Sequence, residues 1–149
     1  MTIWIASDHA GFPMKKDIVD YLGRKYATWS VADMGPEDES PVDYPVYAHR
    51  VAAGVSCGEC QRGILVCGTG LGMSMMANRF LGVRAALCTS VEMAELSRQH
   101  NDANILCLSG RKVSLPDNMA IIDAWMGTEF TDEPRHARRI DLMDILQSR

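Results

Sequence analysis

The chain has 149 residues, of which 47% are hydrophobic and 23% are charged, so it is large enough for one globular domain and too apolar for disorder. The formal net charge of −4 argues against nucleic-acid or membrane-surface binding, no apolar run approaches the roughly 18 residues of a membrane span, and the N-terminus lacks a signal-peptide pattern. Because the five cysteines are odd in number and irregularly spaced, we expect free thiols in the reducing cytoplasm.

Short apolar runs alternate with longer helix-compatible segments from one end of the chain to the other. The apolar runs predict strands over 3–6, 29–34, 64–66, 83–87 and 104–108. The segments between and after them predict helices over about 11–26, 43–55, 73–78, 91–99, 115–126 and 134–147. This alternation, without hairpin signals, predicts a single α/β domain over 1–149: a three-layer α/β/α, Rossmann-like fold around a five-stranded parallel sheet.

A glycine-rich loop follows the third predicted strand. Three glycines at alternate positions separate this strand from the next helix: Gly68, Gly70 and Gly72. Such a loop directs backbone N–H groups and a helix N-terminus at one point, which suits a small anion or a developing oxyanion. Met73 stands where a dinucleotide-binding fingerprint needs its third glycine, so we expect no nucleotide pyrophosphate here.

Cys67 ends the strand that enters this loop, at the edge of the sheet where α/β proteins bind ligands. A thiol beside a nest of N–H donors is favoured as the thiolate. The alternative interpretation is a buried cysteine before a tight turn, and the glycine spacing leads us to prefer the reactive one. Asp8 and His9 occupy a similar junction after the first strand, where they either cap the next helix or converge on the same site.

Cys57 and Cys60 form a Cys-x-x-Cys pair, which suggests a redox or zinc site. The pair lies in a helix-to-strand connection, and no second Cys/His pair follows at metal spacing. Since structural zinc takes four ligands, we expect no metal.

The last predicted helix carries basic and apolar residues on one face. The 4-3-4 spacing aligns Arg135, Arg139, Leu142 and Leu146. The arginines thus extend the apolar face, which indicates that they meet a protein surface or a ligand. Two guanidinium groups one turn apart suit a phosphate, whereas the alternative is a pair of ion pairs within the fold.

Taken together, these motifs resemble type B ribose-5-phosphate isomerase, of the ribose/galactose isomerase family. The resemblance covers nearly the whole chain in order, with motifs at 7–12, 43–45, 67–72, 82–84, 98–104, 109–111 and 135–139. The family shares the predicted fold. Its members interconvert aldose and ketose phosphates without a metal or cofactor, so the resemblance implies a cofactor-independent isomerase.

The resemblance also implies catalytic roles for four side chains. Cys67 is the base that moves a proton between C1 and C2, with Thr69 beside it. His100 opens the sugar ring, and Asp8 handles hydroxyl protons. The enediolate oxygen is held by the amides of Gly68, Gly70, Leu71 and Gly72.

Substrate contacts and assembly follow from the same resemblance. The residues implied for the phosphate are His9, Arg111, Arg135 and Arg139, and Asn101 binds sugar oxygens. The family implies a homodimer, possibly a tetramer, with the helix at about 134–147 packed at a subunit interface. His100 and Asn101 would then serve the neighbour's Cys67.

Ribose 5-phosphate is the expected substrate, because His-Asn-Asp at 100–102 is typical of the ribose branch of the family. Met73, Met75 and Met76 depart from the smaller or branched residues usual after the loop, so a four- or six-carbon sugar phosphate (a tetrulose phosphate or allose 6-phosphate) stays an alternative. Two other classes remain open: a non-catalytic sugar-phosphate-binding module and a thiol redox protein.

Overall fold

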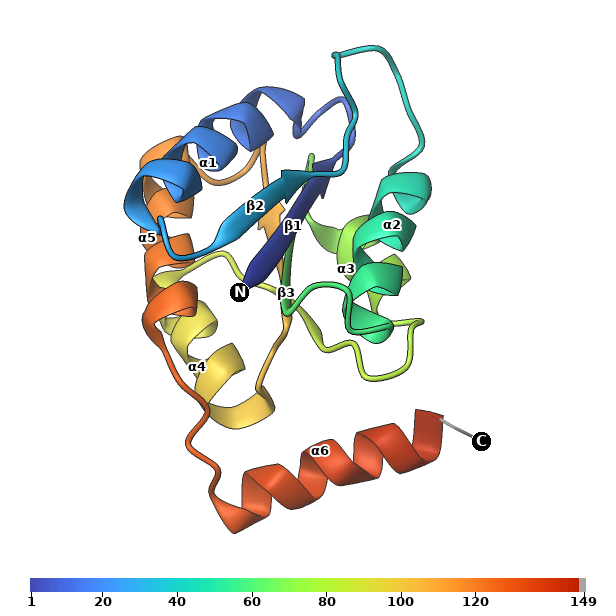
Figure 1. Ribbon diagram of the computed structural model, residues 1–149, viewed down its shortest axis with the longest axis vertical. Coiled ribbons are helices and arrows are strands. Elements are labelled where there is room, and N and C mark those ends of the chain that lie inside the picture. The colour runs from blue at the N-terminus through green and yellow to red at the C-terminus, as the bar shows by residue number, and fades with distance from the viewer. Residues whose placement is uncertain (148–149) are drawn as a thin grey trace.

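The computed structural model describes residues 1–147, and its centre is a five-stranded parallel sheet (Figure 1). The strands lie in the order β2-β1-β3-β5-β4. Their bounds are β1 Thr2–Ser7, β2 Ser30–Asp33, β3 Arg62–Cys67, β4 Ala85–Leu87 and β5 Ile105–Ser109. The expected class, strand number and parallel arrangement are confirmed.

Within residues 1–147 six helices connect or follow these strands. They are α1 Phe12–Lys25, α2 Tyr44–Ser56, α3 Leu71–Ala77, α4 Val91–Asn101, α5 Leu115–Gly127 and α6 Pro134–Gln147. α3 begins two residues earlier than expected, because Gly70 adopts a left-handed φ of 79° and ends the loop there. β4 begins two residues later than expected, since the backbone N–H of Arg84 donates to the Asn104 side chain rather than to the sheet.

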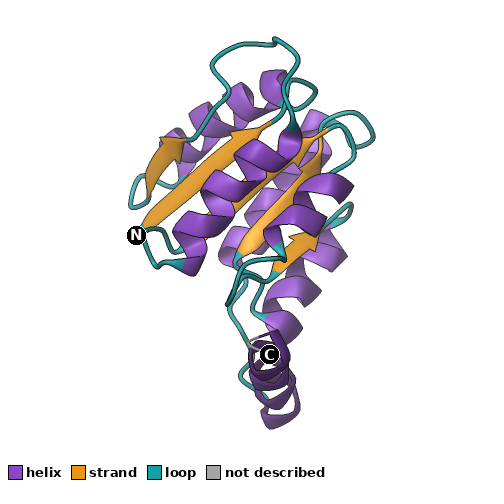
Figure 2. Ribbon diagram, turned by 90° about the vertical axis from the view of Figure 1, so that its right-hand side faces the viewer, coloured by secondary structure: helices purple, strands orange, loops and turns teal. Residues whose placement is uncertain are grey.

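Alternating strand residues feed two separate cores on the two faces of the sheet. Ile64, Val66, Leu106 and Leu108 pack with α1, α4 and α5 on one face. The residues between them in the strands, among them Leu65 and Cys107, pack with α2 and α3 on the other. Period-2 alternation in strands covered by helices on both sides gives the expected three layers, which Figure 2 shows with the orange strands between purple helices.

The sheet has its topological switch point between β1 and β3. From β1 the chain crosses by α1 to β2 at one side, whereas β3 lies on the other side of β1 and leads on toward β5 and β4. Ligands of open parallel sheets bind outside the carboxyl ends of the strands at such a point. Ser7 pairs with Val66 here, so the residues that follow β1 and β3 emerge side by side.

Helix α6 projects from the opposite end of the molecule, where Figure 1 draws it in red below the body of the fold. Its last seven described residues, 141–147, are all exposed. Leu142 and Leu146, on the face expected to meet a surface, are 48% and 64% exposed within this chain. The packing of this helix at a subunit interface therefore stays a prediction.

Candidate active site

Cys67 lies at the carboxyl end of β3 with its side chain turned into the glycine loop. The residue is buried, and its Sγ accepts a hydrogen bond from the backbone N–H of Gly70 at 3.0 Å. A Cβ at Gly70 would stand 2.5 Å from Leu87 Cδ1 and 3.1 Å from the Leu108 carbonyl oxygen, so only glycine fits this position. The loop is thus tightly fixed around the sulfur.

The end of β5 fixes the other side of the same loop. The hydroxyl of Ser109 donates to the carbonyl of Gly68 at 2.8 Å, and the N–H of Arg111 donates to it at 3.1 Å. The Arg111 side chain lies over the loop, since a Cβ at Gly68 would be 3.6 Å from Arg111 Cδ. Arg111 therefore lies next to the loop that follows Cys67, and its role toward the phosphate stays a prediction.

Asp8 and His9 lie at the neighbouring strand end. Asp8 is largely buried, and its Oδ1 accepts a hydrogen bond from the Gly11 N–H at 2.9 Å, so it stabilises the turn into α1. Its own N–H donates to the carbonyl of Val66, which holds it next to the end of β3. His9 accepts a hydrogen bond from the Val42 N–H at Nδ1, so in the neutral ring Nε2 carries the proton. Asp8 thus stabilises the turn into α1 and also lies next to the end of β3.

The remaining loop residues are closer to the surface. Thr69 is exposed, and its Oγ1 accepts a hydrogen bond from the Leu71 N–H at 3.3 Å. A Cβ at Gly72 would be 2.6 Å from Tyr44 Cζ, so the Tyr44 ring stands directly against the loop. Sequence reasoning gave Tyr44 no role, although it lies within the Asp-Tyr-Pro motif at 43–45. Tyr44 therefore forms a wall of the candidate site.

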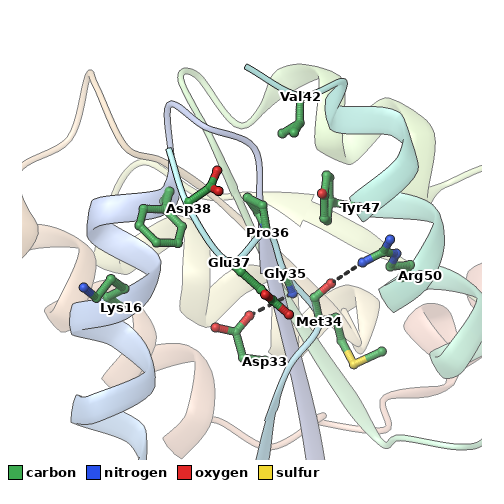
Figure 3. A pocket seen from close by; sticks show the side chains of 11 residues that line it. Lys16, Asp33, Met34, Gly35, Pro36, Glu37, Asp38, Val42, Tyr47 and Arg50 are labelled. Carbon is green, nitrogen blue, oxygen red and sulfur yellow. Dashed lines mark hydrogen bonds between the residues drawn. The ribbon is translucent and has the colours of Figure 1, made fainter. Parts of the chain in front are cut away.

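A cavity of about 850 Å³ opens beside this site at the same edge of the sheet (Figure 3). It lies between α1, α2 and the loop after β2, and it touches the site through Val42, the hydrogen-bond donor to His9. Cys67 and the glycine loop do not line it. This cavity is therefore separate from the pocket-forming loop around Cys67.

Four of the expected site residues lie at the opposite edge of the sheet: His100, Asn101, Arg135 and Arg139. His100 and Asn101 end α4, which leads into the amino end of β5, whereas Cys67 pairs with Ser109 at the carboxyl end of β5. Five strand residues at about 3.3 Å each separate the two edges by about 16 Å. The structure therefore divides the expected site into two groups.

Several residues of this second group are held in place by contacts within the chain. Arg84, just before β4, donates from Nε to the carbonyls of Asn101 and Asp102 at 2.9 and 3.1 Å. Arg135 forms an exposed ion pair with Glu133 at 2.9 Å, whereas Arg139 is exposed and forms no salt bridge with a residue of 1–147. The ion pair in the fold that we considered as an alternative thus exists for Arg135, in a local and solvated form.

Cys57 and Cys60 do not resemble a reactive pair. Both thiols are free, and Cys57 is exposed whereas Cys60 is buried. Burial is the main cause that raises the pKa of Cys60 to about 11, so this thiol stays protonated and weakly nucleophilic near neutral pH. Over residues 1–147 no cluster of three or more His, Cys, Asp and Glu side chains is arranged to hold a metal ion.

Comparison with known proteins gives a family assignment that agrees with this geometry. A model of the Ribose/Galactose Isomerase family matches residues 3–143. A relative from Escherichia coli K12, ribose-5-phosphate isomerase B, is 42% identical over 142 residues, which cover 95% of this chain and 93% of that protein.

In the part of the chain that the structure describes, no helix is long and apolar enough to cross a membrane.

Solved structures agree in fold over almost the full length. Ribose-5-phosphate isomerase B of Clostridium thermocellum has a TM-score of 0.95 at 44% identity and covers 99% of this chain and 98% of its own. The enzyme of Mycoplasma genitalium, solved with bound ribulose-5-phosphate, has a TM-score of 0.92 at 42% identity, with 99% and 96% of the two chains covered. The chain therefore belongs to the ribose/galactose isomerase family.

Proposed function

We propose that this protein interconverts ribose 5-phosphate and ribulose 5-phosphate without a metal or cofactor. The observation that carries the proposal is the hydrogen bond from the Gly70 N–H to Cys67 Sγ at the switch point of the sheet. A sulfur that accepts from a fixed amide is held in one orientation, beside the amides that can stabilise an enediolate oxygen. The relatives support the choice of substrate, since the Mycoplasma genitalium protein holds ribulose-5-phosphate.

The proton transfer needs no group beyond those at the carboxyl edge. Cys67 Sγ takes the proton from C2 of the open-chain aldose, and the electron pair of that C–H bond forms the C1–C2 double bond of an enediolate. The negative charge moves to O1, where the loop amides and Thr69 stabilise it. The proton then returns to C1 and gives the ketose, while Asp8 accepts and returns the hydroxyl proton. The isomerisation is redox-neutral overall and needs no oxidant or reductant.

Ring opening and phosphate binding need the second group of residues, which in one chain lies at the opposite edge of the sheet, a strand length of about 16 Å away or more. We therefore infer a homodimer in which His100 and Asn101 of one subunit face Cys67 of the other. His100 protonates the ring oxygen, and Asn101 binds sugar hydroxyls. The phosphate is held by four residues from both edges: His9, Arg111, Arg135 and Arg139.

The surface of α6 supports this assembly. Leu142, Met143 and Leu146 are 48%, 42% and 64% exposed, so the helix presents a run of apolar side chains to solvent in the single chain. A two-fold dimer that buries this run repeats each contact and produces two equal sites.

The methionines after the loop give no support to another sugar. Met73 is fully buried in the core between the sheet and α2 and α3, and Met76 packs against that core. Met75 is 68% exposed. These side chains fill space beneath the helix or face solvent, so the five-carbon substrate remains the better proposal.

Replacing Cys67 by serine tests the proposal. We expect kcat for ribose 5-phosphate to fall by about 10² or more, the lower range for a positioned base. Thermal stabilisation by the sugar phosphate should persist, since the phosphate contacts are intact. A serine variant with near-normal turnover would exclude Cys67 as the base, and wild-type protein that binds the sugar without turnover would leave a binding module.

A further inference from the structure

Helix α6 attaches to the body of the protein through a histidine. His136 is 5% exposed and is the buried residue of this helix within the described range, whereas Leu142 and Leu146 are 48% and 64% exposed in the single chain. Within one chain, a titratable ring is thus the buried contact of this helix, and the leucines are left for the proposed dimer interface. The aromatic ring of His136 is therefore the feature to explain at this position.

The His136 ring stacks on the ring of His100. The ring centroids are 4.3 Å apart and the planes differ by 13°, which is close to parallel. His136 Nε2 is buried without a hydrogen-bond partner in residues 1–147, and the closest carboxylate oxygen, of Glu133, is 3.9 Å away. A buried unpartnered nitrogen costs stability, so the stack is maintained against that cost.

The two rings are held in register by the segment before α6. The N–H and the hydroxyl of Thr131 both donate to the carbonyl of Gln99, at 3.2 and 2.8 Å. Gln99 immediately precedes His100 in the last turn of α4. The turn that carries His100 and the start of α6 thus form one rigid unit.

Burial and nearby positive charge disfavour the protonated form of His136. Burial first, then the positive charges of His100, Arg135 and Arg139, lower the pKa of His136, and Glu133 opposes them only in part. Two positive rings at a centroid distance of 4.3 Å would also repel each other.

We propose that His136 is a positioning residue that supports the His100 imidazole by parallel stacking. The inference rests on the proposed function, in which His100 opens the sugar ring. An aromatic platform restricts the rotation of His100 about its side-chain bonds, so the proton is offered in one direction. His136 itself need not touch the substrate.

Three variants separate the platform from mere packing. His136→Phe keeps a flat ring, His136→Leu fills the space without one, and His136→Ala empties it. His49→Ala is the matched control, because this exposed histidine on α2 meets Phe80 edge-on, away from the stack. For each full-length variant we would measure kcat and KM with ribose 5-phosphate, and the ring-proton NMR shifts of His100.

We expect the Phe variant to keep kcat within about threefold, whereas the Leu and Ala variants lose about tenfold or more with little change in KM. The His100 ring protons should move downfield in the Leu and Ala variants, since a stacked ring shields them, and should stay near their wild-type shifts in the Phe variant. The His49 variant should match the wild type in every measurement.

The outcomes separate this inference from the proposed function. Unchanged His100 shifts in the Ala variant, or equal kcat in the Phe, Leu and Ala variants, would overturn the positioning role while His100→Ala stays inactive. If His100→Ala turns over normally, the ring-opening role fails, whatever the NMR shows. A variant that unfolds is identified by its thermal transition, and the NMR comparison then rests on the Phe and Leu variants.

Discussion

Replacing Gly70 by alanine links the geometry of the glycine loop to catalysis. Gly70 has a left-handed φ of 79°, and its N–H is the donor to Cys67 Sγ. Gly82 provides a matched control, because its φ is 69° and a Cβ there would meet nothing within 4 Å. The control carries the conformational cost of alanine without the steric one.

The expected magnitudes follow from these two environments. A left-handed conformation costs a residue with a Cβ about 1–2 kcal/mol, partly offset by the smaller entropy of the unfolded chain, so Gly82→Ala should destabilise by about 1 kcal/mol. At Gly70 the new Cβ also meets Leu87 Cδ1 at 2.5 Å and the Leu108 carbonyl oxygen at 3.1 Å. The Leu87 side chain can move, but the backbone of β5, an interior strand, cannot, which adds about 1–3 kcal/mol.

Urea unfolding of both variants at one protein concentration measures these differences, and turnover of ribose 5-phosphate measures the effect on the site. Gly70→Ala should also reduce kcat by about 10², because a displaced loop no longer holds Cys67 Sγ in place or directs its amides at the developing enediolate charge. Gly82→Ala should leave kcat unchanged. Equal stability of the two variants, with normal turnover by Gly70→Ala, would refute the account of the loop.

Two further predictions concern α6. Arg135→Ala and Arg139→Ala should each raise KM for ribose 5-phosphate by losing a charge-assisted contact of about 1.5–3 kcal/mol, whereas the exposed Arg138→Ala on the same helix should not; unchanged KM in the first two would remove them from the phosphate site. Stability should fall as the pH drops below the ordinary histidine value of about 6.5, because the pKa of His136 is lowered in the fold and the unfolded chain binds the proton more readily. This loss continues down to the folded pKa, and urea unfolding between pH 7 and 5 should show a shallower loss in His136→Phe; parallel curves would contradict it.

The sequence was sufficient for the architecture because its buried strands are nearly continuous apolar runs. Ile64, Leu65 and Val66, for example, are all fully buried, with alternate side chains in the two cores. The position of β5 between β3 and β4 could not be predicted, since apolar patterning does not specify which parallel strands become neighbours. Hence the sequence predicts at which edge of the sheet each loop emerges, but not which loops lie next to each other along that edge.

The parts of the candidate site that lie in one continuous motif could be predicted. The parts that are brought together by packing between distant segments could not. Cys67 and the glycine loop form one continuous segment whose backbone dictates its own geometry. Tyr44 approaches Gly72 only through the packing of α2 beside α3, a contact between residues 28 positions apart (72 − 44). His136 was hidden for another reason: helical spacing marked the leucine face as the buried one, whereas the single chain buries the histidine face.

The central claim, that one site combines the carboxyl edge of one subunit with the amino edge of another, is tested most directly by mixing two inactive variants. Cys67→Ser and His100→Ala damage opposite edges of the sheet, so a mixed dimer contains one intact site and one doubly damaged site. With random pairing at equal concentrations, about half of the dimers are mixed and activity should reach about a quarter of the wild-type value. Mass spectrometry of tagged chains shows whether subunits exchange. Mixed dimers with no more activity than either parent would contradict the claim and confine the site to a single chain.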